Sequence, residues 1–159
     1  MASFAELDGN NKVLRVIKAG NDIPTSNGPL GENDMHADGE AWCNKFFKGG
    51  SWKQTSATGS FRKQLAGTNY LYDESLDMFV TPRPYPGFVL DANGDWEAPN
   101  GMARPTPGAQ QQYPNPADPS TPHVFVDLTW NSSDNKWEAT RSITDQVRVQ
   151  WNGSTWDEV

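Results

Sequence analysis

The sequence is short of cysteine, histidine and positive charge. Cys43 is the single cysteine among 159 residues, so the chain has no internal disulfide and no metal site built from several cysteines. The two histidines, His36 and His123, form neither a HExxH nor a HxH arrangement. Lysine and arginine number 13 against 20 acidic residues, which gives a formal charge of −7. Because an acidic chain repels phosphate backbones, we expect no direct contact with nucleic acid.

Long apolar runs and the common catalytic motifs are also absent from the sequence. No segment approaches eighteen consecutive apolar residues, so we expect no membrane span. The opening MASFAELDGNNK lacks a basic segment followed by an apolar one, so we expect no signal peptide and synthesis in a reducing cytoplasm. The sequence has no Gly-x-Ser-x-Gly elbow, phosphate-binding loop or dinucleotide glycine motif. We therefore expect no enzymatic activity, no catalytic residue and no cofactor.

A repeated pattern of a large apolar residue, a turn and a second large apolar residue dominates what is present. In each copy the first residue is aromatic or Leu, and the Asp or Asn that follows accepts local backbone hydrogen bonds in turns. Alternating apolar and polar residues, as in Val147–Trp151, are typical of strands with one buried face. We therefore predict a mainly β fold of consecutive antiparallel hairpins in a small sheet or sandwich, with one short α-helix. The predicted hairpins close at Leu7–Val13, Tyr72–Phe79, Leu90–Trp96, Trp130–Trp137 and Trp151–Trp156.

The predicted helix lies between Asp38 and Gly49. We expect Asp38 to cap its first turn, Glu40 to favour the positive end of the helix dipole, and Gly49 to end it in a left-handed conformation. Cys43 is expected to be a small core residue of this helix rather than a reactive thiol. Apolar side chains at i, i+1, i+4 and i+5 form one stripe that we expect to pack on the sheet: Trp42, Cys43, Phe46 and Phe47.

Composition divides the chain into three parts. Asn100–Pro122 holds six prolines and a glutamine tract but only two large apolar residues, Met102 and Tyr113, which indicates a semi-rigid linker or a surface excursion. We therefore predict a β-rich domain with the helix over residues 1–100, the proline-rich segment over 101–122 and a small β-hairpin unit over 123–159. A shorter proline run, Pro82–Pro86, is predicted to be a connector or a sheet edge, with a docking peptide as the alternative.

Two acidic loops resemble metal sites, and each also has an ordinary explanation. Asp91–Asp95 resembles the opening of a calcium loop, but Trp96 stands where such a loop has Gly, and no Glu occupies its twelfth position. The second loop combines a histidine with carboxylates that are typical of metal ligands: His36, Asp34, Asp38 and Glu40. An Asn-Gly turn explains the first loop and acids beside a helix cap explain the second, so we expect no metal site.

The tryptophans leave one functional alternative open. Aromatic side chains on a β surface can stack on sugar rings, so a glycan partner stays open beside the interpretation that these rings form cross-strand core pairs. The residues that we consider candidates for interaction are Pro82, Pro84, Tyr85, Pro86, Tyr113, Trp130, Trp137, Trp151 and Trp156.

Three stretches of the chain resemble small structural proteins of marine tailed phages, especially those of cyanobacteria. They are MASFAELDGNNKVLRVI at the beginning, GSFRKQLAGTNYLYDESLDMFVTPRPYPGFVLDANGDWEAP in the middle and WNGSTWDEV at the end. In such proteins the patterns FA.LD.NN.V..VI, FRK..AG..Y.YD and PY.S..L....WEAP recur in the same order. This chain departs from them at Gly87, where those proteins have Ser, in an expanded loop before Met35–Phe47, and at Asn100–Pro122, which looks like an insertion.

The resemblance implies a component of the virion that is made in the host cytoplasm, and none of its motifs is catalytic. It implies other virion structural proteins and further copies of this chain as partners. It does not distinguish capsid decoration from neck, tail or fibre. The alternative is a carbohydrate-binding module of a phage tail that contacts a host receptor.

Overall fold

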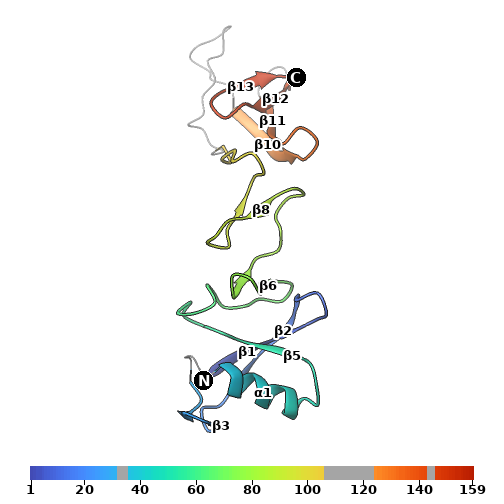
Figure 1. Ribbon diagram of the computed structural model, residues 1–159. Coiled ribbons are helices and arrows are strands. Elements are labelled where there is room, and N and C mark those ends of the chain that lie inside the picture. The colour runs from blue at the N-terminus through green and yellow to red at the C-terminus, as the bar shows by residue number, and fades with distance from the viewer. Residues whose placement is uncertain (32–35, 106–123, 143–145) are drawn as a thin grey trace. The chain divides into compact units, whose positions relative to one another are not determined.

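The described residues fold mainly as β-structure. The computed structural model describes residues 1–31, 36–105, 124–142 and 146–159, which form thirteen strands and one helix in small antiparallel sheets (Figure 1). This confirms the predicted mainly β fold with a single short helix. Among these residues, no helix has both the length and the apolar content that crossing a membrane requires. The helix is α1 (His36–Phe46), and the strands outside the predicted hairpins are β3 (Pro24–Thr25), β4 (Gly28–Pro29) and β5 (Ser51–Thr55).

All five predicted hairpins are present. They consist of β1 (Ala2–Leu7) with β2 (Val13–Ala19), β6 (Leu71–Asp73) with β7 (Met78–Val80), β8 (Val89–Leu90) with β9 (Trp96–Glu97), β10 (Val124–Asn131) with β11 (Lys136–Ser142), and β12 (Arg148–Trp151) with β13 (Trp156–Glu158). In four of them the predicted closing residues are paired across the strands, namely Leu7 with Val13, Tyr72 with Phe79, Trp130 with Trp137 and Trp151 with Trp156.

The turns of these hairpins share one side-chain arrangement. The Asp or Asn that opens each turn accepts hydrogen bonds from backbone N–H groups two to four residues later, so it satisfies donors that the strand ladder leaves unpaired. These bonds lower the pKa of Asp8 and Asp91, because the N–H groups favour the charged carboxylate. The accepting residues, with donor–acceptor distances of 2.7–3.1 Å, are Asp8, Asp73, Asp91, Asn131 and Asn152.

The chain forms two compact units. Unit 1 contains Met1–Pro84 and Leu90–Asp95, and unit 2 contains Tyr85–Val89 and Trp96–Val159. This division differs from the predicted boundary, because residues 85–89 and 96–100 belong with the C-terminal strands. The physical reason is apolar packing, since Phe88 is buried in the same core as the rings of β10 and β11. The predicted proline-rich segment lies outside the described residues from position 106 onward.

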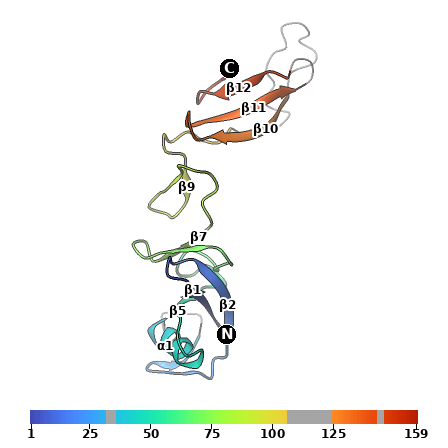
Figure 2. The ribbon, with the colours of Figure 1, turned by 90° about the vertical axis from the view of Figure 1, so that its right-hand side faces the viewer.

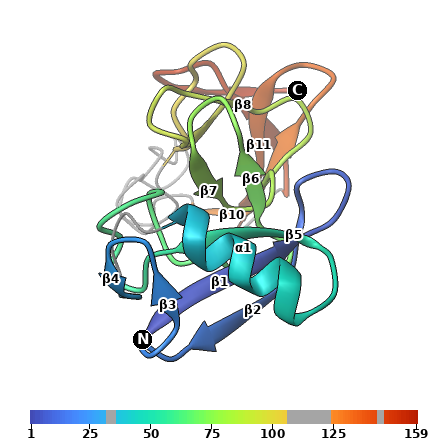
Figure 3. The same ribbon diagram turned by 60° about the horizontal axis from the view of Figure 1, so that its bottom comes forward.

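Unit 1 is organised around a three-stranded sheet with apolar contacts on both faces. Its strand order is β2-β1-β5, and α1 crosses one face (Figure 3). Alternate residues of a strand point to opposite faces. Phe4 of β1 packs with Leu30 and the helix, whereas Leu7 packs with Phe79 of the β6–β7 hairpin. Contacts on both faces explain why Ala2–Ala5 is buried at every position.

The helix packs on this sheet through a narrower face than predicted. Gly39 and Cys43, one turn apart, are its buried residues, and a Cβ at Gly39 would lie 2.3 Å from the ring of Phe4. The backbone approaches the sheet so closely that only Gly fits. The predicted four-residue stripe is therefore wrong at Phe46, which is 63% exposed. The side of α1 that carries Gly39 and Cys43 faces the sheet, so Phe46 points away from the sheet.

The predicted cap of the helix also needs correction, whereas Gly49 does take part in its termination. Asp38 lies inside the first turn, and its carboxylate accepts hydrogen bonds from the backbone N–H and the hydroxyl of Ser26 at 2.7 and 2.6 Å. It therefore ties α1 to the preceding loop instead of capping it. At the other end Lys48 adopts the left-handed conformation with a φ of 59°, and Gly49 follows with 133°. The N–H of Gly49 donates to the carbonyl of Asn44 at 2.7 Å, as in a Schellman motif.

Unit 2 is built on a four-stranded antiparallel sheet with the order β10-β11-β12-β13 (Figure 2). Trp130 and Trp137 lie opposite each other on β10 and β11, with ring centroids 5.2 Å apart. Phe88 packs edge-on against Trp130 at 5.1 Å. Large rings bury much area per residue, so a short chain can close a core with few of them.

Candidate functional site

Three of the four tryptophans that the sequence offers for interaction lie in the core of unit 2. The exposed fractions are 8% for Trp130, 1% for Trp137 and 5% for Trp156. Trp151 is half-buried, and its ring lies 5.4 Å from that of Trp156. Packing of this kind is what cross-strand ring pairs produce. A sugar ring therefore finds no exposed face on the three buried indoles.

The predicted proline run is exposed and forms no strand. Tyr85 within it is half-buried, and its ring packs edge-on against Trp137 with centroids 5.2 Å apart. Tyr85 therefore borders the core of unit 2 instead of projecting from the surface. Tyr113 lies outside the described residues. The exposed members of the run are Pro82, Pro84 and Pro86.

The loop that resembles a calcium site is held by bonds of its own turn. One carboxylate oxygen of Asp91 accepts the backbone N–H groups of Asn93 and Asp95 at 2.9 and 2.7 Å. Its other oxygen accepts the side-chain amide of Asn93 at 3.0 Å. Asp95 forms an ion pair with Lys63 at 2.6 Å. The hydrogen bonds of Asp91 are the turn chemistry that the sequence predicts for the segment.

The acidic loop around His36 does not converge on the imidazole ring in the described part of the chain. Nδ1 of His36 lies 3.3 Å from the amide oxygen of Gln54, and the ring packs edge-on against Phe61. Asp38 binds Ser26, and Asp34 and His123 lie outside the described residues. Within the described ranges, no three His, Cys, Asp or Glu side chains are grouped as metal ligands.

A buried arginine, Arg62, joins separate segments of unit 1. Its Nη1 donates to Glu40 at 2.6 Å and its Nε donates to Asp77 at 2.7 Å. The hydroxyl of Tyr72 donates to the same oxygen of Asp77. Burial, and secondarily this bond, raise the pKa of Tyr72. A carboxylate oxygen already shared by two donors is poorly placed to act as a general base, so we assign this cluster to stability.

Cys43 is the remaining group with intrinsic reactivity. It is fully buried beneath α1, and burial raises the pKa of its thiol to about 12. Because the thiolate is the reactive form, such a thiol is a weak nucleophile. The structure confirms the prediction that Cys43 is a core residue.

The outer side of α1 carries an aromatic pair in which Phe46 is exposed and Trp42 is half-buried against the core of unit 1. Trp42 and Phe46 lie one turn apart, and their rings stack with centroids 4.8 Å apart and planes 18° apart. Together with Lys45 they line a shallow hollow. These three residues form what we call the α1 aromatic surface. An exposed large ring that stacks on a half-buried one is typical of a surface that binds another protein.

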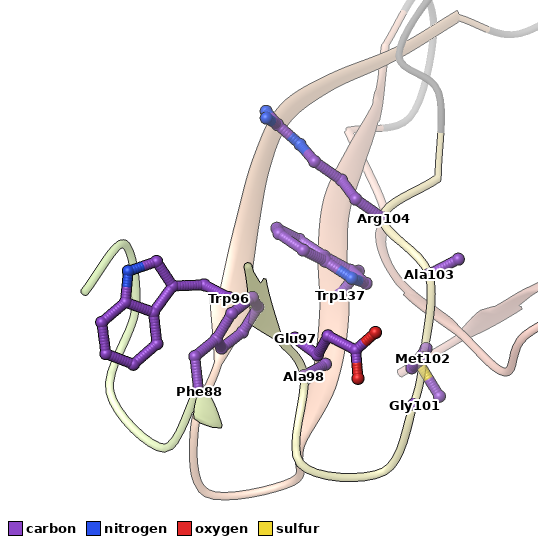
Figure 4. A pocket seen from close by; sticks show the side chains of 9 residues that line it. All are labelled: Phe88, Trp96, Glu97, Ala98, Gly101, Met102, Ala103, Arg104 and Trp137. Carbon is purple, nitrogen blue, oxygen red and sulfur yellow. The ribbon is translucent and has the colours of Figure 1, made fainter. Parts of the chain in front are cut away.

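Unit 2 contains a pocket of about 260 Å³ beside Trp137 (Figure 4). Strand β11 forms one side of it, and the segment 101–104 forms another. Its charged groups are the exposed side chains of Glu97 and Arg104. The apolar part of the lining includes Phe88, Ala98, Met102 and Trp137.

A buried indole N–H faces this pocket. Nε1 of Trp137 has no hydrogen-bond partner within the described part of the chain. Figure 4 shows this nitrogen on the edge of the ring toward Met102 and Ala103. The guanidinium carbon of Arg104 lies 5.5 Å from the centroid of the same indole. The lining of the pocket therefore includes an N–H donor, a cation and a carboxylate beside an apolar wall.

The sequence pattern does not predict either place. Of the two apolar lines along α1, it assigns Phe46 to the core although this side chain is 63% exposed, whereas Trp42 does pack partly on the core of unit 1. Gly39 beside Cys43 is the signal that distinguishes the lines, because a glycine in a helix marks a close approach. The segment 101–104 has no periodicity, so no pattern points to the pocket.

Compared with family models, curated proteins and solved structures, the chain matches none of them.

Proposed function

We propose that this chain is a non-enzymatic structural subunit of a phage virion that acts by adhesion to other virion proteins. The resemblance of its beginning, middle and end to small structural proteins of marine tailed phages supports this assignment. The observation that carries the adhesive role is the α1 aromatic surface, a stacked pair of large rings on a helix fixed to a sheet. Localisation in the virion is part of the same proposal.

The rings of this surface are held in place by the rings behind them. Phe47 packs edge-on against Phe46 at 5.0 Å and stacks on Trp52 at 4.8 Å, and Trp52 is buried in the core of unit 1. An aromatic anchor held in this way loses little conformational freedom when it binds. The surface is therefore suited to act as an energetic centre of an interface.

The partner that fits this surface is a protein with an apolar recess and an acidic rim. Trp42 and Phe46 supply the apolar contact, and the exposed Lys45 between them supplies the positive charge. Stable incorporation buries on the order of a thousand Å² or more, so loops around the helix contribute as well. A larger virion protein meets this requirement. Further copies of this chain have a net charge of −7, so they can also supply an acidic rim. The proposal therefore includes self-association.

The test is incorporation of tagged chain into particles of the phage that encodes it. We expect the wild-type chain to copurify with the particles and a Trp42→Ser, Phe46→Ser variant to be depleted at least about tenfold, because two anchor residues are lost. A Leu14→Ser variant removes another exposed apolar residue, 52% exposed on β2, and should incorporate normally. Circular dichroism of each variant establishes that it is folded. Equal incorporation of all three chains would refute the adhesive role of this surface.

The second candidate function is a carbohydrate-binding module. The pocket of unit 2 favours it, because this pocket combines hydrogen-bond donors, an acceptor and an apolar wall, as small polar ligands require. Since three of the tryptophans first considered for this role are buried, the candidate rests on the pocket and not on exposed rings.

A further inference from the structure

We propose that the pocket of unit 2 binds a single uncharged sugar ring, with Nε1 of Trp137 and the guanidinium of Arg104 as hydrogen-bond donors and the carboxylate of Glu97 as acceptor. The inference deepens the carbohydrate-binding candidate and rests on it. It does not depend on the role of the α1 aromatic surface, which belongs to unit 1.

The first support is the unpartnered indole of Trp137. Its side chain is 1% exposed, and Nε1 has neither a protein acceptor nor exposed surface among the described residues. A buried donor without an acceptor is rare, because it has lost its water and gained no bond in return. This nitrogen lies on the pocket side of the ring, toward Met102 and Ala103 (Figure 4). A ligand oxygen placed there supplies the acceptor.

Trp130 shows why the position of the indole matters. Its Nε1 is also buried without a partner within the described ranges, but Trp130 does not line the pocket. An unpartnered indole alone therefore does not define a ligand site. At Trp137 the same feature coincides with a cavity and with two charged side chains.

The charges of the lining select the chemistry of the ligand. A guanidinium only donates hydrogen bonds, and a carboxylate only accepts them. Arg104 and Glu97 carry opposite charges in one pocket, so a ligand with a net charge is attracted by one and repelled by the other. A hydroxyl group both donates and accepts. Several hydroxyls on one uncharged ring therefore satisfy Arg104, Glu97 and the Trp137 N–H together.

The size and the walls of the pocket agree with one sugar ring. Its volume of about 260 Å³ lies just below the range of roughly 300–1,000 Å³ that drug-sized ligands occupy. Met102 and Ala98 offer apolar surface to the C–H groups of such a ring. The segment 101–104 forms no strand, and the proposal requires it to move aside so that a hydroxyl can reach Nε1.

The experiment uses the full chain labelled with nitrogen-15. Its seven tryptophans give seven indole N–H resonances, each of which is assigned by correlation through its side chain to its own backbone amide. The probes are the methyl glycosides of glucose, galactose, mannose and N-acetylglucosamine, each titrated to about 100 mM, a range that detects millimolar dissociation constants. We expect at least one probe to shift the Trp137 resonance saturably and to leave those of Trp42 and Trp52 unchanged.

Surface variants then test the assigned groups. Glu97→Ala and Arg104→Ala should each weaken binding about tenfold or more, because each removes charge-assisted hydrogen bonds. Lys136→Ala, which removes a charge of unit 2 outside the pocket, should leave binding unchanged. The same titration is made with glucuronate and with glycine, which carry charges. The proposal is overturned if no glycoside shifts the Trp137 resonance, if the shift survives both pocket variants, or if only glucuronate or glycine produces the shift. Incorporation into particles is unaffected by any of these results, so failure here is distinct from failure of the structural role.

Discussion

Arg62 and Glu40, 22 residues apart in the chain, form an ion pair with a distance of 2.6 Å between Nη1 and Oε1, and 7% of the arginine side chain is exposed. Burial lowers the pKa of Arg62, but the hydrogen bond and the charge of Glu40 more than offset it, so the net shift is upward. Glu40 lies on α1, and Arg62 also binds Asp77, which precedes β7. One guanidinium thus joins the helix to the β6–β7 hairpin.

Replacing Arg62 should therefore destabilise the chain strongly. We expect Arg62→Met to lower the free energy of unfolding by about 2 kcal/mol, because it removes the buried guanidinium that Glu40 and Asp77 share, although Glu40 keeps Lys53 and the N–H of Gln54 as partners. Arg15→Met is the matched control. Arg15 also pairs with a carboxylate, Glu6, at 2.5 Å, but it is 51% exposed, and an exposed pair contributes about 1 kcal/mol or less. Urea denaturation measures both variants, and equal losses would contradict the assigned role.

The contact between Gly39 and Phe4 gives a second prediction. In Gly39→Ala the new methyl group meets the Phe4 ring, so we expect a loss of about 2 kcal/mol in the free energy of unfolding from overpacking. Gly9→Ala is the control, because a Cβ at Gly9 meets nothing within 4 Å and its φ is not positive. Thermal unfolding of both variants checks this. A Gly39→Ala chain as stable as Gly9→Ala would mean that α1 does not lie so close to the sheet.

Glu138 on β11 makes the stability of the chain depend on pH. Its carboxylate accepts hydrogen bonds from Asn131, Gln150 and Arg148 at 2.7–2.8 Å, which lower its pKa below the ordinary value of 4.5. A group with a lowered folded pKa stabilises above its unfolded pKa, and this contribution disappears as the pH falls through the folded pKa.

We expect Glu138→Gln to cost about 1–2 kcal/mol at pH 7 and to cost progressively less as the pH falls below 4.5. Denaturation of both chains over this pH range measures the difference. A difference that stays constant with pH would show that the charge of Glu138 contributes nothing.

The burial of Cys43 predicts slow chemistry at the thiol. With a pKa of about 12 and no exposed surface, Cys43 should react with a disulfide reagent orders of magnitude more slowly in the folded chain than in urea. Because the chain has one cysteine, the absorbance of the coloured thiolate that the reagent releases reports on Cys43 alone. Fast labelling under native conditions would show that α1 opens from the sheet.

The hairpins could be predicted because their signal is local. Asp91, for example, and the residues that donate to its carboxylate lie within one turn, so the sequence alone predicts the bonds. The periodicity of α1 did not predict its orientation, because the contact that fixes it joins Gly39 to Phe4 on a distant strand. The division into units depends in the same way on Phe88 packing with Trp130. The candidate sites are of this second kind and become visible only when strands and loops are assembled.

The most direct test of the proposed structural role is quantitative mass spectrometry of purified particles of the phage that, under this proposal, encodes the chain. The account predicts that the chain is present in a fixed ratio to the major capsid protein in every particle fraction of a density gradient. A chain that is abundant in the infected-cell lysate but absent from the particles would contradict it.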